Sequence, residues 1–353
     1  MKSSNNTSRR QFLLSTLSLA ITTRLLRADQ GSISVDVKVV NVLVSVRDKE
    51  GRIVSDLGKG DFVLEEDGRE QNIQYFAREN DLPLTVGLLV DTSLSQRRVL
   101  GEEQSASYRF LEKVLNQDRD RAFVVHFDWE VELLQDLTSS HKRLESALGS
   151  LATPQPRQWG GQRSPWPGGP SGPGPGRRGR GGGTLLYDAV FLGSDELMKK
   201  QQGRKAMIVL TDGVDTGSRT SLEGSVEAAL RADTLVYSVL FADAEMYQHI
   251  GGFGGGGMGR RRGGGPSGFP TFPDGKKVLK KLSKETAAGF FEVSTKHPID
   301  QTYQRIEEEL RNQYSLGYTP ARGDTNPGYH KIHVTTHQKG LVVQARDGYY
   351  ANW

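Results

Sequence analysis

The chain has 353 residues, enough for two or three domains and a substantial core, and its formal net charge is +4. Five basic residues fall within residues 1–28 with no acid beside them, so the rest of the chain holds 41 basic against 42 acidic residues. Overall charge therefore gives no support to nucleic-acid binding. The absence of cysteine excludes disulfides and a lipid anchored on a cysteine.

Residues 1–28 are predicted to be a twin-arginine signal peptide. The pair Arg9 and Arg10 precedes a modest apolar run, and the small residue Ala28 follows it. Cleavage after Ala20 is an alternative, and so is a basic amphipathic helix that stays on the chain. No other stretch approaches the ~18 apolar residues of a membrane span. The sequence thus predicts a bacterial protein exported in folded form, periplasmic or secreted, with no membrane span.

Short strand-like segments fill residues 34–80. Residues 34–46 alternate between apolar and polar types through much of their length, and turn residues follow at 48–51. Two further strand-like segments are residues 62–65 and 73–76. This spacing is typical of a β-sandwich, but only half of the strands are present.

A buried strand is predicted at residues 84–90, and polar residues stand at its end. Asp91, Ser93 and Ser95 bring one carboxylate and two hydroxyls to the C-terminal tip of this strand. Mg²⁺ prefers oxygen ligands in near-octahedral geometry and keeps several waters, so such a tip can hold it. An ordinary turn between a strand and a helix would explain the same residues equally well.

Two later segments carry further oxygen atoms. Thr184 follows a glycine run and opens an amphipathic stretch, and a second buried strand at residues 206–211 ends in Asp212. Parallel strands of an open α/β sheet bring their carboxyl ends to one edge, where ligands bind. The three segments are therefore expected to converge.

Helical and strand patterns alternate from residue 84 to residue 313. Helices are predicted at residues 99–115, from 138–140 onward, and at 184–199, 222–232, 277–287 and 299–312, and further strands at 121–127, 131–134, 235–240 and 290–293.

The pattern D-x-S-x-S, then a lone Thr, then Asp resembles the metal-ion-dependent adhesion site, or MIDAS, of the von Willebrand factor type A (VWA) family. The resemblance implies that Ser93, Ser95 and Thr184 offer hydroxyls to Mg²⁺ or Mn²⁺, and that Asp91 and Asp212 anchor its waters. The order of elements also resembles this family. The implied fold class is α/β, a Rossmann-like VWA domain at residues 84–313 with a mostly parallel central sheet.

The missing strands of the sandwich are expected at residues 314–353. Strand-like segments occur there at residues 315–318, 330–335 and 341–345. The VWA domain would then be inserted in a β-sandwich built from N-terminal and C-terminal segments. The flanking segments also resemble bacterial VWA-related proteins, and this resemblance spans nearly the whole chain after the signal peptide.

Two segments, residues 155–183 and 251–273, belong to no predicted element. Each holds 11 glycines and no acid, and together they hold eight arginines. Such compositions bury too little apolar surface to fold, so disorder is predicted. The segments are either basic arms beside the metal edge or surface loops that are lengthened at low entropic cost.

The sequence favours a binding protein and not an enzyme. The metal would recognise an acidic group, Asp or Glu, on a protein partner, which the family resemblance connects with adhesion or assembly at the cell envelope. A hydrolase that uses the ion as a Lewis acid is one alternative, although no base is identifiable. Binding of an anionic polymer by the arginine-rich loops is another. The tripeptide at residues 322–324 spells an integrin-recognition motif but is predicted to be a turn.

Overall fold

The computed structural model describes residues 39–78, 82–153, 183–241, 274–320 and 327–351. The predicted signal peptide, the tripeptide at residues 322–324 and, except for Gly183, the two glycine-rich and arginine-rich segments lie outside these ranges. Within the described ranges, none of the helices combines the length and the apolar character that crossing a membrane requires.

One sheet has six strands. They are β5 (Leu84–Asp91), β6 (Arg121–Phe127), β7 (Val131–Thr138), β8 (Arg204–Thr211), β9 (Leu235–Phe241) and β10 (Phe290–Val293). Their order across the sheet is β10-β9-β8-β5-β6-β7, and β7 alone runs antiparallel to its neighbour. This is the mostly parallel sheet that the sequence predicts.

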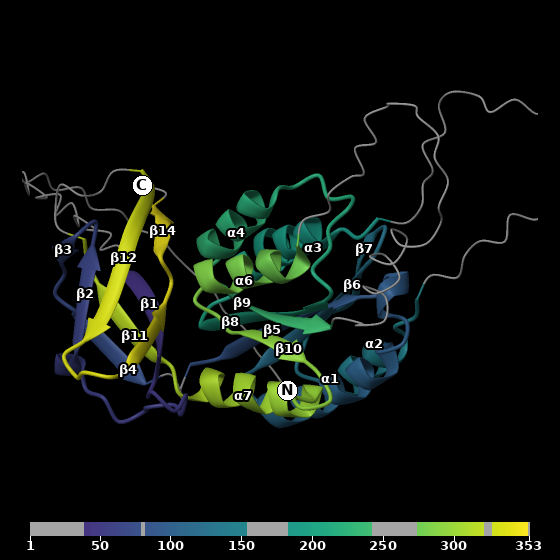
Figure 1. Cartoon of the computed structure of the whole chain (residues 1–353), viewed down its shortest axis with the longest axis horizontal. Coiled ribbons are helices and arrows are strands. Elements are labelled where there is room, and N and C mark those ends of the chain that lie inside the picture. Colours follow the sequence, from purple (N-terminus) through teal and green to yellow (C-terminus); the bar gives the residue numbers. More distant parts are fainter. Residues whose placement is uncertain (1–38, 79–81, 154–182, 242–273, 321–326, 352–353) are drawn as a thin grey trace, which may run out of the picture. The chain divides into compact units, whose positions relative to one another are not determined.

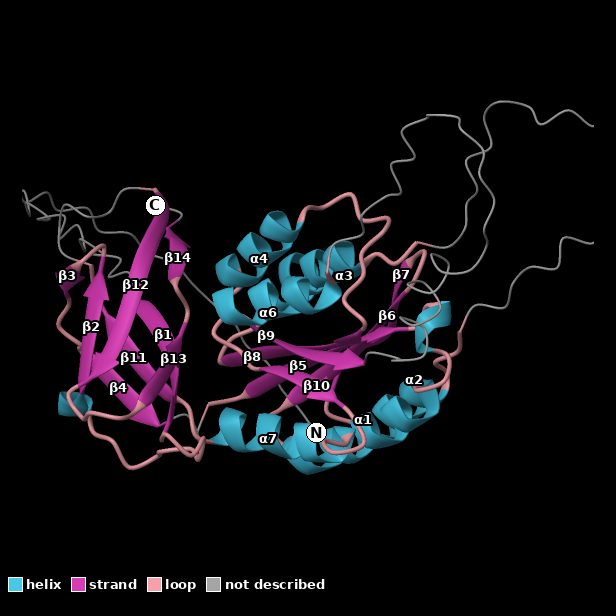
Figure 2. Ribbon diagram, viewed as in Figure 1, coloured by secondary structure: helices cyan, strands magenta, loops and turns pink. Residues whose placement is uncertain are grey.

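Helices cover both faces of this sheet (Figure 1 and Figure 2). They are α1 (Leu100–Val114), α2 (His141–Gly149), α3 (Leu186–Leu192), α4 (Leu222–Arg231), α6 (Gly275–Glu285) and α7 (Ile299–Arg311). Helices α1, α2 and α7 share one apolar core with the sheet, and α3, α4 and α6 share the other.

The two cores explain the composition of the inner strands. Every residue of β5 and of β8 is buried. Neighbouring residues point to opposite faces, so Leu88 belongs to the core with α1 and α7, whereas Leu89 belongs to the core with α3 and α6. A parallel sheet that is covered on both faces requires such largely apolar strands.

Two antiparallel sheets combine strands from both ends of the chain. One has the order β13-β1-β11-β4 and the other β14-β12-β2-β3. Their strands are β1 (Val40–Arg47), β2 (Phe62–Glu66), β3 (Arg69–Glu70), β4 (Tyr75–Arg78), β11 (Tyr314–Tyr318), β12 (Gly328–Thr336), β13 (Val342–Ala345) and β14 (Gly348–Ala351). Residues of both sheets form one core, in which the rings of Phe62, Phe76 and Tyr314 pack together.

The predicted fold class is confirmed, with differences in detail. The short strands β3 and β14 are absent from the sequence-based prediction. The segment predicted at residues 73–76 is shifted, since β4 begins only at Tyr75, where it pairs with β11. The helix predicted at residues 184–199 is interrupted. Its α-helical part ends at Leu192 and continues as a π-helical turn, Gly193–Leu197, and a 3-10 turn, Met198–Lys200.

Candidate metal centre

The carboxyl ends of β5 and β8 lie side by side. Val90 pairs with Leu210 in parallel register, so Asp91 and Thr211 are the adjacent terminal residues of the two strands. Asp212 follows directly after β8. The register of two buried strands thus brings two acids from distant parts of the sequence to one edge of the sheet, as the sequence predicts.

Both carboxylate oxygens of Asp91 accept hydrogen bonds. Thr211 Oγ1 donates to Asp91 Oδ2 at 2.6 Å, and the backbone N–H of Ser93 donates to Asp91 Oδ1 at 2.9 Å. The residue is 0% exposed. These bonds fix the orientation of the carboxylate before any ligand arrives.

The environment of Asp91 opposes its negative charge. Burial raises the pKa of Asp91 from 3.8 to about 7, and the nearby Asp212 carboxylate also raises it. The hydrogen bonds from Ser93 and Thr211 act in the opposite direction. Two carboxylates that repel one another, one fully buried and one half-buried, are an arrangement that a bound cation would stabilise.

Ser93 and Ser95 stand on one side of a tight turn after β5. A 3-10 turn, Leu94–Gln96, begins immediately after Ser93. It brings the hydroxyl oxygens of the two serines to 2.9 Å from one another. Both side chains are half-buried, so a pair of neutral oxygen atoms lies at the surface of the same loop that carries Asp91.

Two hydrogen bonds connect the backbone of Thr184 to the loop that carries Asp212. The N–H of Thr184 donates to Thr216 Oγ1 at 2.8 Å, and the N–H of Thr216 donates to the carbonyl of Thr184 at 3.0 Å. A third bond, from Leu185 N–H to the carbonyl of Asp128, connects this segment to the end of β6. The structure therefore joins the Thr184 segment to the loop after β8.

Thr211 and Asp128 are supporting residues that the sequence-based prediction misses. Thr211 orients Asp91, and its only signal is its position directly before Asp212. Asp128 Oδ2 accepts a hydrogen bond from Thr92 Oγ1 at 3.2 Å, which ties the motif loop to the end of β6.

The donor set is rich in hydroxyls and poor in strong ligands. In the described ranges, no three His, Cys, Asp or Glu side chains gather in a way that could hold a metal ion. A cation here would therefore meet two carboxylates, Asp91 and Asp212, together with hydroxyl oxygens and water. Oxygen ligands with retained water suit Mg²⁺ and Mn²⁺ and not zinc held by nitrogen or sulfur.

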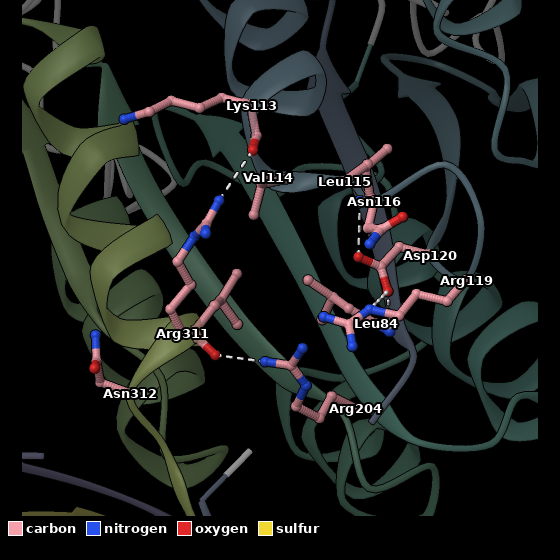
Figure 3. Close-up of a pocket in the computed structure, with 11 residues that line it drawn as sticks. Leu84, Lys113, Val114, Leu115, Asn116, Arg119, Asp120, Arg204, Arg311 and Asn312 are labelled. Carbon is pink, nitrogen blue, oxygen red and sulfur yellow. Dashed lines mark hydrogen bonds and ion pairs between the residues drawn. The ribbon is translucent and has the colours of Figure 1, made fainter. Parts of the chain in front are cut away.

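A cavity of about 550 Å³ lies at the opposite edge of the sheet, where β5 and β8 begin (Figure 3). Four cationic side chains line it: Lys113, Arg119, Arg204 and Arg311. Arg204 Nη1 donates to the carbonyl of Leu310 at 2.6 Å, and Arg311 Nη2 donates to that of Lys113 at 3.1 Å. These carbonyls end α7 and α1, where the helix dipole is negative. Lys113 and Arg119 each pair with an acid. Contacts within the fold therefore account for all four cationic side chains of this cavity.

Comparison with known proteins finds similar solved structures. No protein-family model and no curated protein sequence matches this chain. The chain is similar to an aerotolerance-related membrane protein from Bacteroides fragilis, at 13% identity over 64% of this chain and 98% of that chain, with a TM-score of 0.42. It is also similar to a von Willebrand factor type A protein from Catenulispora acidiphila, at 10% identity over 82% of this chain and 73% of that chain, with a TM-score of 0.45.

A third similar structure is proximal thread matrix protein 1 from the mussel byssus, with a zinc-occupied MIDAS motif. It shares 14% identity over 70% of this chain and 50% of its own, with a TM-score of 0.41. At these identities the likeness concerns the fold alone. The α/β part of the chain has the six-stranded, mostly parallel sheet with helices on both faces that the resemblance implies.

Proposed function

We propose that the chain binds a divalent cation, Mg²⁺ or Mn²⁺, and captures a carboxylate of a protein partner through it. Ser93, Ser95 and Thr184 would offer hydroxyls, and Asp91 and Asp212 would hold the metal-bound waters. The observation that carries the proposal is the fully buried Asp91. Its two oxygens are held in place and its charge is opposed by burial and by Asp212.

The donor set accounts for the choice of partner group. The two carboxylates of the site, Asp91 and Asp212, can balance the charge of a divalent ion but not exceed it. The hydroxyls of Ser93, Ser95 and Thr184 are neutral. The bound ion would supply Lewis acidity at an open coordination position, which an Asp or Glu side chain of a partner can fill. Binding and not turnover is expected, because within the described ranges the Ser93 hydroxyl contacts the Ser95 hydroxyl and the Asp91 carboxylate, and no histidine is bonded to it.

We further propose that the protein works outside the cytoplasm. Residues 1–28 would act as the twin-arginine signal peptide, and the protein would be periplasmic or secreted. The VWA domain would span residues 84–313, between sandwich halves at residues 34–80 and 314–353. Assembly or adhesion at the cell envelope is a role that suits such a location.

Calorimetric titration with Mn²⁺ and Mg²⁺ tests the metal site. The wild type should bind one ion, whereas Asp212→Asn should bind it at least about tenfold more weakly, since the variant loses an anchoring charge. Asp195→Asn is the matched control, because Asp195 is a half-buried acid of the π-helical turn after α3, where it pairs with Lys199. Equal affinity in all three proteins would refute the site.

Selection from a random peptide library tests the partner chemistry. Peptides that bind the immobilised protein in Mn²⁺ and elute with EDTA should share an Asp or Glu. Replacing this residue by Asn or Gln should abolish binding. Enrichment of peptides without a required acid would contradict the proposed recognition even if the metal binds.

A further inference from the structure

Glu103 lies on the core-facing side of α1. The buried residues of this helix include Leu100, Glu103, Ser107, Phe110 and Val114, the spacing of a single helix face. The large neighbours of Glu103 on this face are apolar, yet Glu103 brings a carboxylate into the core and is 0% exposed. Acidic residues are almost never fully buried without a partner, so this position needs an explanation.

Neither carboxylate oxygen of Glu103 has a hydrogen-bond partner in the described part of the chain. Oε1 and Oε2 are both buried and unpaired. The nearest hydroxyl on the same helix face is engaged elsewhere, since Ser107 Oγ and Tyr303 Oη lie 2.6 Å apart in their own hydrogen bond. A buried oxygen without a partner is costly, and native structures that keep one often reserve it for water or an ion.

Glu103 is electrostatically close to the candidate metal centre. Burial raises the pKa of Glu103 well above its usual range, and the Asp91 carboxylate and Glu102 raise it further. Helix α1 also begins at Leu100, after only three residues have followed the turn that carries Ser95. The buried carboxylates of Asp91 and Glu103 therefore repel one another in the protein interior, where like charges interact strongly, and Asp212 acts on Asp91 in the same sense.

We propose that Glu103 is a buried counter-charge of the metal centre, which favours the bound cation electrostatically from the core side without coordinating it. The inference rests on the proposed function, because it requires a divalent cation at Asp91 and Asp212. A buried counter-charge is screened less than a surface one. Glu103 would raise the affinity for the metal without using the coordination position that a partner carboxylate needs.

A purely structural explanation predicts something different. Glu103 lies in the first turn of α1, where the helix dipole favours an acid. An acid retained for that reason affects the stability of the fold and leaves the affinity for metal unchanged. Metal affinity and stability therefore have to be measured together.

The experiment uses the full chain and Mn²⁺ alone as the probe. Glu103→Gln keeps the shape of the side chain, Glu103→Leu restores an apolar residue to the helix face, and Glu102→Gln is the control at the exposed neighbouring position. Calorimetry gives the affinity, and thermal melting in EDTA and in saturating Mn²⁺ gives the stability of the metal-free and loaded states.

Both Glu103 variants should bind Mn²⁺ about tenfold more weakly than the wild type, and Glu102→Gln should bind it normally. In EDTA, Glu103→Leu should melt at a higher temperature than the wild type, while Mn²⁺ should raise its melting temperature by less. Unchanged affinity in both variants would overturn the role of Glu103 and leave the metal site intact. A wild type that binds no Mn²⁺ would overturn the proposed function as well.

Discussion

Acidification should weaken metal binding steeply, because the proton and the cation compete for Asp91. The pKa of this carboxyl group is raised from 3.8 to about 7, chiefly by burial. A metal ion requires the deprotonated form, so its apparent affinity falls once the pH drops below the pKa. A carboxylate with an ordinary pKa would show no such loss near neutral pH.

The size of the effect follows from the pKa. At about pH 5.5, roughly 1.5 units below the pKa of Asp91, apparent affinity should be about thirtyfold lower than at about pH 8. Stability of the metal-free protein should change in the opposite sense. The folded-state pKa lies above the unfolded value, so the folded state binds the extra proton between about pH 4 and pH 7 and loses roughly 4 kcal/mol of stability as the pH rises through this window.

Titration calorimetry with Mn²⁺ at several pH values measures the first effect, and urea unfolding in EDTA measures the second. Titrations near pH 7 in buffers with different ionisation enthalpies should also reveal release of at least about half a proton per ion bound, the share that Asp91 supplies. Asp195→Asn should follow the wild-type profile. A flat affinity between pH 5.5 and pH 8, in protein that circular dichroism shows to be folded, would refute the assignment of a raised pKa to Asp91.

Two substitutions test the support of the site and of the sheet. Thr211→Val removes the 2.6 Å hydrogen bond to Asp91 at nearly constant volume, and calorimetry should show at least about tenfold weaker Mn²⁺ binding, since bonds to charged groups contribute about 1.5–3 kcal/mol. Unchanged affinity would mean that Asp91 needs no such support. Gly87→Ala would press a methyl group against the Phe123 ring and should lower the free energy of unfolding in urea by about 1–3 kcal/mol. The control Gly101→Ala meets nothing within 4 Å in a helix and should stabilise by up to about 1 kcal/mol, so equal losses at both positions would contradict the packing argument.

The sequence predicts the strands of the α/β sheet well where apolar runs have sharp borders. Strands β6 and β10 begin and end at the predicted residues, 121–127 and 290–293. The π-helical turn after α3 could not be predicted in this way, because the helical spacing of apolar residues continues through it without a break. At the first residue of this turn the backbone packs closely against β8, since a Cβ at Gly193 would lie 2.9 Å from Met207 Sδ. Only the three-dimensional arrangement contains that constraint.

The candidate site divides in the same way. Asp91 and Asp212 end recognisable strands, so the pattern alone indicates that they converge. Thr211 has the sequence pattern of an ordinary strand residue. Its hydrogen bond to Asp91 depends on the register of two strands that are distant in sequence. From the sequence, Glu103 would be predicted to be a solvated acid on an amphipathic helix. Only its burial in the structure distinguishes it from the exposed Glu102.

The pairing of strands from the two ends of the chain has a consequence for biosynthesis. Strand β1 pairs with β11 and β13, and Arg78 in β4 pairs with Tyr314 in β11. During translation, the N-terminal strands therefore emerge long before their partners and must wait until the whole α/β segment has left the ribosome. Such non-local pairing is slow to form and leaves strand edges open in the meantime. The α/β segment can bury its own cores first, which shortens the effective loop between β4 and β11 and makes closure of the sandwich a late event.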